Sequence, residues 1–148
     1  MSLEDIISTY KSKISSKTVI LFIGDANVGK TALINRLTNN GFDTLYEQTE
    51  NLNIIHHQNF IYLDFPGDYI YSDFSYKKPD LIILVYDLRN RRSYKNIKFW
   101  KDKVSHTWEN EDIPIEIFGN KYDGLFRLVF EDTRLISAKD NTNVLCSY

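Results

Sequence analysis

Short apolar runs recur along this chain, separated by polar turns and by segments with helical spacing. Five of the runs have the length and composition of strands, at residues 18–23, 52–57, 60–65, 81–86 and 113–118. The second and third flank Gln58-Asn59 and therefore predict a hairpin. Residues 134–136 predict a last short strand, so the pattern predicts six strands in all.

Apolar residues at helical spacing lie between several of these runs. The spacing predicts helices over residues 2–15, 31–39 and 93–108, whereas residues 41–50 have no period and predict an irregular loop. Strands that alternate with helices are typical of an α/β fold with a mainly parallel sheet and helices on both faces. In such a fold, ligands bind beyond the carboxyl ends of the strands.

Length and composition restrict the function further. The chain has 148 residues and a net charge of −2, which predicts one domain and no nucleic acid or anionic membrane as the main partner. No apolar run approaches the roughly 18 residues of a membrane span. The single cysteine, Cys146, excludes an internal disulfide and fits a reducing, cytoplasmic location.

A phosphate-binding motif lies between the first predicted strand and the helix that follows it. Residues 24–31 read Gly-Asp-Ala-Asn-Val-Gly-Lys-Thr, which matches G-x-x-x-x-G-K-[ST]. Backbone N–H groups of this loop and the N-terminus of the helix would bind phosphates, while Lys30 reaches the β and γ phosphates and Thr31 ligates Mg²⁺. The candidate phosphate-binding residues are Asp25, Ala26, Asn27, Val28, Gly29, Lys30, Thr31 and Ala32.

Three more motifs follow predicted strands. Asp64-Phe65-Pro66-Gly67 offers a carboxylate to the water shell of Mg²⁺ and a glycine N–H to the γ-phosphate. In Asn120-Lys121-Tyr122-Asp123, the Asp123 carboxylate can accept two hydrogen bonds from guanine, and adenine lacks those donors. In Ser137-Ala138-Lys139, a backbone N–H can meet the guanine O6. The motifs together predict a guanine nucleotide.

In this order, the four motifs resemble those of the Ras superfamily of small GTPases, most closely the Rab branch, over residues 18–145. The resemblance implies roles for three residues of the predicted loop. Thr49, which lies 19 residues after Lys30, would complete the Mg²⁺ shell and sense the γ-phosphate. Phe42 would stack against guanine, and Tyr46 would cover the phosphates.

The family implies a GTP/GDP switch with Mg²⁺ held by Thr31, Thr49 and, through water, Asp64. Its protein effectors and regulators would bind loops 42–52 and 65–77, which the γ-phosphate orders. A second hypothesis stays open at this point. The chain would then be a pseudo-GTPase interaction module that binds nucleotide without turnover or serves as a structural subunit.

Departures from the family pattern predict slow hydrolysis. Asp68 stands where most of the family has a glutamine that orients the attacking water, and an ionised carboxylate can only accept hydrogen bonds. The methyl group of Ala26 would crowd the γ-phosphate, and Pro66 stiffens the second loop. The candidate catalytic residues are Lys30, Gly67 and Asp68, and we expect a weak GTPase.

The C-terminal third is shorter than in the family. Only residues 124–136 separate Asp123 from Ser137, and the chain ends at Tyr148. We therefore expect a GTPase domain over 18–148 that lacks a full penultimate and last helix. An N-terminal extension, 1–17, would cover the sheet with Ile6, Ile7, Tyr10 and Ile14 instead.

Cys146 is third from the end of the chain, so it does not fit the C-a-a-X signal. From the sequence we expect no direct lipid anchor, and any contact with membranes would run through a partner protein.

Overall fold

The computed structural model describes residues 2–9, 17–38, 44–48, 52–65, 78–108, 112–121 and 133–144, with the backbone alone for 44–48. The described elements are α1 Leu3–Thr9, β1 Thr18–Ile23, α2 Lys30–Leu37, β2 Thr44–Gln48, β3 Asn53–His57, β4 Phe60–Asp64, β5 Leu81–Asp87, α3 Arg91–Lys95, α4 Ile97–Thr107, β6 Ile115–Asn120 and β7 Thr133–Leu135.

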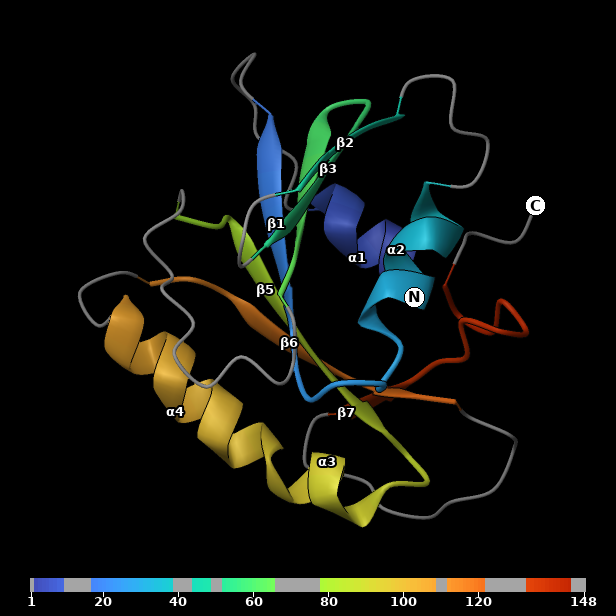
Figure 1. The fold of residues 1–148 in the computed structure, drawn as a ribbon, viewed down its shortest axis with the longest axis vertical. Coiled ribbons are helices and arrows are strands. Elements are labelled where there is room, and N and C mark those ends of the chain that lie inside the picture. Colours follow the sequence, from blue (N-terminus) through green and yellow to red (C-terminus); the bar gives the residue numbers. More distant parts are fainter. Residues whose placement is uncertain are drawn as a thin grey trace.

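The strands form one sheet in the order β2-β3-β4-β1-β5-β6-β7 (Figure 1). β4, β1, β5, β6 and β7 run parallel, while β2, β3 and β4 pair antiparallel. Every residue of β1 and β5 is buried, as expected for central strands covered on both faces. The predicted α/β class, the mainly parallel sheet and the hairpin are confirmed.

Two predictions of local structure were wrong. Thr44–Gln48 forms the edge strand β2 inside the stretch predicted as an irregular loop, because pairing with β3 supplies hydrogen bonds that the sequence period does not reveal. Among the described residues, the sheet therefore has seven strands and not the predicted six. The predicted helix over 93–108 is divided into α3 and α4, with Asn96 as the C-cap of one and the N-cap of the other.

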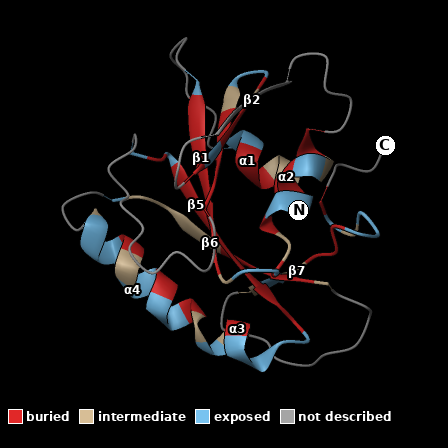
Figure 2. Ribbon diagram, in the orientation of Figure 1, coloured by how far each residue is buried: buried red, intermediate tan, exposed pale blue. Residues whose placement is uncertain are grey.

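Helices cover both faces of the sheet, as Figures 1 and 2 show. α1 and α2 share a buried cluster with Ile20, Phe22 and Ile83 on one face. α3 and α4 lie on the other face, where Ile97, Trp100 and Val104 of α4 join a second buried cluster. The candidate functional site lies at the carboxyl ends of β1, β4, β5 and β6.

The N-terminal helix α1 belongs to the core. Leu3, Ile6 and Ile7 are each 2% exposed or less, and they pack in one cluster with residues of β1 and β5. The backbone N–H groups of Leu3 and Glu4 donate to the carbonyls of Asn143 and Val144, at 2.8 and 2.9 Å. The expectation that Ile6 and Ile7 cover the sheet is confirmed, while Tyr10 and Ile14 lie outside the described residues.

Other predictions concern segments that the structure does not describe. The expected shortening between Asp123 and Ser137 falls largely on residues 122–132, which lie outside the described ranges. None of the helices in the described ranges is both long enough and apolar enough to cross a bilayer.

Candidate functional site

The loop from Gly24 to Gly29 connects β1 to α2 in a conformation that two glycines permit. Gly29 has a φ of 100°, and a Cβ there would lie 2.1 Å from Nδ2 of Asn120. A Cβ on Gly24 would lie 2.1 Å from the carbonyl oxygen of Val85. Any side chain at either position would therefore displace β5 or the end of β6.

Lys30 is the first residue of α2 and is 6% exposed. Its ammonium group donates to the carbonyl of Gly24 at 2.8 Å and to that of Asp25 at 2.6 Å. These two hydrogen bonds hold the Lys30 ammonium group against the phosphate loop. The ammonium group thus lies at the N-terminus of α2, where the first backbone N–H groups of the helix point outward. The arrangement favours an anion at this place.

Thr31 and Asp64 come together from α2 and the end of β4. The Thr31 hydroxyl donates to Oδ2 of Asp64 at 2.5 Å. Burial raises the pKa of the Asp64 carboxyl above its usual value, although the hydrogen bond from Thr31 and the charge of Lys30 oppose this shift. The structure thus pairs two of the three residues that the sequence predicted as metal ligands.

Asn120, the last residue of β6, joins three segments of the site. Its Nδ2 donates to the carbonyl of Val28 at 2.9 Å, and its Oδ1 accepts the N–H of Ala138 at 3.1 Å. Asn120 is 1% exposed, so these bonds have little competition from water. The phosphate loop, the end of β6 and the loop after β7 are therefore fixed to one another by a single amide.

Lys121 follows directly and has a φ of 65°. Its Nζ donates to the carbonyl of Asn27 at 2.8 Å and forms an ion pair with Asp87 at 3.0 Å. The lysine thus crosses over the site from the end of β6 to the phosphate loop. The contact of Lys121 with a ligand stays a prediction of the motif.

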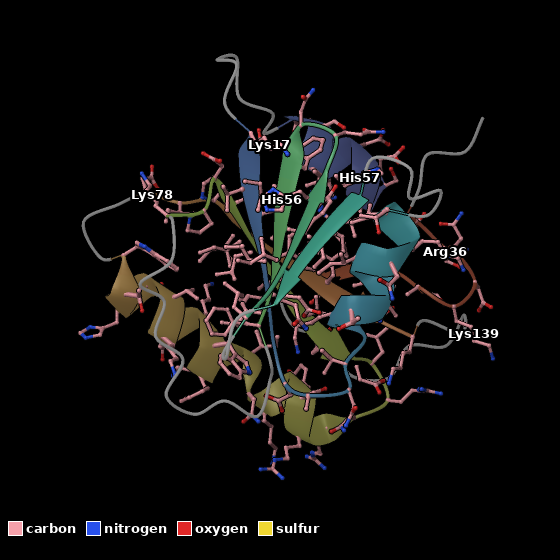
Figure 3. All side chains as sticks on the ribbon, turned by 45° about the horizontal axis from the view of Figure 1, so that its top comes forward. Lys17, Arg36, His56, His57, Lys78 and Lys139 are labelled. Carbon is pink, nitrogen blue, oxygen red and sulfur yellow. The ribbon has the colours of Figure 1, made fainter. Side chains whose placement is uncertain are left out.

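The loop after β7 is held by Arg36, a residue that the sequence analysis did not single out. The Arg36 guanidinium donates to the carbonyl of Ala138 at 2.8 and 3.0 Å and to that of Lys139 at 2.8 Å. Figure 3 shows Arg36 and Lys139 as neighbours. Ser137 is buried and exchanges backbone hydrogen bonds with Thr142, which closes a tight turn. The backbone N–H of Ala138 donates to Oδ1 of Asn120, so this N–H group already has an acceptor within the protein.

A cavity of about 590 Å³ lies over the phosphate loop. Its volume is in the range of small-molecule sites. Asn53 of β3 and Phe65 line it without having been predicted, since neither belongs to the invariant positions of a motif. The lining residues are Ala26, Asn27, Gly29, Lys30, Thr31, Ala32, Asn53, Asp64, Phe65 and Lys121.

Several predicted site residues lie outside the described part of the chain. These are Phe42, Thr49, Gly67, Asp68 and Asp123. Tyr46 lies in β2, of which the structure describes the backbone.

The Asp25 side chain binds α4 and the residue before it, and Asp25 is not among the residues that line the cavity. Its role in phosphate binding through the backbone of the loop stays a prediction. Its carboxylate accepts the indole N–H of Trp100 at 2.7 Å and the Nδ2 of Asn96 at 2.7 Å. Trp100 is 3% exposed. The sequence predicted a helix over 93–108 that includes Trp100, but no sequence signal linked Trp100 to the phosphate loop.

The fold and the site define a protein of the P-loop α/β class, because the glycine loop follows a central parallel strand and opens onto a helix N-terminus. The family model described as the Ras family matches residues 18–145. The chain belongs to the Ras family.

Relatives with Rab names support the predicted likeness to that branch. "Ras-related protein Rab-32D" of Dictyostelium discoideum is 32% identical over 126 residues, which is 74% of this chain and 55% of the relative. "Ypt/Rab-type GTPase YPT7" of Saccharomyces cerevisiae is 29% identical over 70% of this chain and 57% of the relative. "Ras-related protein Rab-7B" of Dictyostelium discoideum is 29% identical over 82% and 66%. The chain thus spans 55 to 66% of the length of these curated relatives.

Proposed function

We propose that this protein binds GTP and GDP and acts as a nucleotide-controlled switch of the Ras/Rab type. The observation that carries the proposal is the position of Asn120. It ties the phosphate loop to the loop after β7 through Val28 and Ala138, at 2.9 and 3.1 Å. Asp123 is three residues further on, where its carboxylate would accept the N1–H and 2-amino group of guanine.

The residues present fit Mg²⁺ as the metal partner of the phosphates. Thr31 and Asp64 offer oxygen atoms, which Mg²⁺ prefers. Within the described ranges, no three His, Cys, Asp or Glu side chains gather as a metal site. An ion bound here would accordingly take phosphate and water oxygens beside Thr31, Asp64 and the proposed Thr49. When bound, Mg²⁺ supplies positive charge to the phosphate oxygens.

Residues of the protein would make the other contacts with the nucleotide phosphates. Lys30, at the start of α2, would neutralise charge on the β and γ phosphates, and the N–H of Gly67 would contact the γ-phosphate. The loops 42–52 and 65–77 would take up one arrangement when that phosphate is present, and would offer it to effectors and regulators.

Nucleotide binding is tested by titration of the purified chain with GTP, GDP and ATP, each with and without Mg²⁺. We expect binding of both guanine nucleotides, and weak or no binding of ATP. Denaturation of the purified protein, followed by identification of any released nucleotide, gives an independent result. Equal affinity for ATP would contradict guanine recognition. The absence of any nucleotide binding would favour the pseudo-GTPase hypothesis.

We further propose that intrinsic hydrolysis is slow, because the Asp68 carboxylate can accept but not donate a hydrogen bond to the attacking water. The test is a single-turnover GTP hydrolysis assay of the wild-type chain and of Asp68→Gln. We expect the variant to hydrolyse GTP at least several-fold faster with unchanged GTP affinity. A matched Asp68→Asn variant shows whether an amide alone is sufficient. An Asp68→Gln rate at or below the wild-type rate would refute this role.

A further inference from the structure

Basic side chains gather on one outer surface of the molecule, formed by α3 and α4. Residues 91–107 contain one acidic side chain, Asp102, in a chain whose net charge is −2. Figure 2 shows the outward sides of both helices as exposed. We call this the basic surface, and it consists of Arg91, Arg92, Lys95, Lys98, Lys101 and Lys103.

The helix dipoles favour only two of these six cations. Neither α3 nor α4 has an acidic residue in its first turn, and Arg91 begins α3, where the helix dipole disfavours cations, whereas Arg92 and Lys95 lie in the last turn of α3. Lys95, Lys98 and Lys101 follow one another at spacings of three residues, so that like charges repel. In the described part of the chain, none of the first five basic residues of the surface forms an ion pair. Their positive charge is therefore directed to solvent.

Phe99 lies within the basic surface. It is 51% exposed and is the one large apolar side chain among the described residues that is exposed to this degree. The ammonium group of Lys103 lies 5.8 Å from the centre of the Phe99 ring. The apolar side of α4 is occupied by the core through Ile97, Trp100 and Val104. Basic side chains beside an exposed aromatic ring combine the two residue types that favour contact with a lipid interface.

We propose that the basic surface binds the face of an anionic lipid bilayer, with Phe99 at the level of the headgroups. Lysine predominates on α4, and its point charge on a flexible stem suits a diffuse negative surface better than a fixed set of carboxylates. The rest of the molecule carries net negative charge, so only this side would be attracted to the lipid and the molecule would be oriented by it. The proposal does not depend on nucleotide binding.

The basic surface differs in charge from the chain as a whole. A value of −2 for the whole chain excludes strong attraction only if the charges are evenly distributed. The fold instead places the six cations of the basic surface on two successive helices of one face. The predicted absence of a direct lipid anchor is compatible with such electrostatic contact, which needs no covalent lipid.

The test is co-sedimentation of the full chain with vesicles of phosphatidylcholine alone or with about 30% phosphatidylserine added. We expect binding to the anionic vesicles, little binding to the neutral ones, and loss of binding when salt is raised from about 0.1 M to about 1 M. The variant Lys98→Gln/Lys101→Gln should lose roughly 30-fold in affinity, on the basis of about fivefold for each cation near such a surface.

The matched control is Lys17→Gln/Arg134→Gln, which removes the same charge from β1 and β7 and their vicinity. Lys17 is exposed, and Arg134 is 44% exposed beside Glu116. We expect this control to retain wild-type vesicle affinity within about twofold, and Phe99→Ser to fall between the two. Equal loss in both double variants, or equal binding to neutral and anionic vesicles, overturns the proposal. Binding to polyglutamate or RNA without binding to anionic vesicles also overturns it, and would assign the surface to a macromolecular partner.

Discussion

The contact between Asp25 and Trp100 allows a quantitative test of how the phosphate loop is held. The Asp25 carboxylate accepts two hydrogen bonds, both 2.7 Å long, from Trp100 and Asn96. Because Trp100 is 3% exposed, removal of the carboxylate leaves a buried indole N–H without its acceptor. A hydrogen bond to a charged group contributes about 1.5–3 kcal/mol.

The perturbation is a double-mutant cycle of Asp25→Ala and Trp100→Phe. Trp100→Phe also removes buried ring surface, so the single variant overstates the hydrogen bond, and the cycle subtracts this contribution. We expect a coupling free energy of about 1.5–3 kcal/mol between the two positions. Each single variant should lower Tm by several degrees, since 1 kcal/mol corresponds to roughly 2–4 °C in a chain of this size.

The assay is urea unfolding of all four proteins at one fixed nucleotide concentration, because a ligand of the folded state raises apparent stability. The control cycle pairs Asp25→Ala with Trp108→Phe. Trp108 follows α4 two turns beyond Trp100, roughly 12 Å along the helix axis. That cycle should give a coupling below about 0.5 kcal/mol. A similarly small coupling for Asp25 and Trp100 would refute the proposed link between the phosphate loop and α4.

Two further variants test the site and the core separately. Gly29→Ala should lower guanine-nucleotide affinity at least 100-fold in a fluorescent-GDP titration, because its Cβ would lie 2.1 Å from Nδ2 of Asn120 at a φ of 100°. Unchanged affinity would show that the loop geometry tolerates a side chain. Ile7→Ala should destabilise the chain by about 2–4 kcal/mol in urea, since Ile7 is 2% exposed in the cluster that covers β1 and β5. The exposed Ser8→Ala on the same helix is its control, and an equal effect of both would contradict a core role for α1.

Local patterns along the chain were sufficient to predict the class of fold and the position of the site. Apolar runs of strand length between helical patterns predict an α/β sheet, because burial on two faces requires continuous apolar residues. The motif at residues 24–31 predicted the phosphate loop. Two glycines at that spacing allow the backbone to take up the conformation of the loop, and this signal lies within eight consecutive residues. The last residues of the strands, Asp64 and Asn120, were predicted to converge because parallel strands end on one side of the sheet.

Features that depend on residues far apart in the chain could not be predicted from these local patterns. β2 forms because β3 offers its edge, although residues 41–50 show no period of their own. The sequence places Asp25 in the phosphate loop, but only the packing of α4 brings Trp100, 75 residues away, to its carboxylate. Arg36 reaches the loop at Ala138 across 102 residues for the same reason.

The net charge can be counted from the sequence, whereas the positions of the charges on the surface depend on the fold. The sequence determines a net charge of −2, and the fold determines that Arg and Lys side chains of α3 and α4 share an outer surface. Hydrophobic periodicity is local because each element buries its own face, and so it can be read along the chain. Contacts between elements depend on how those faces pack against one another, and the three-dimensional arrangement alone determines them.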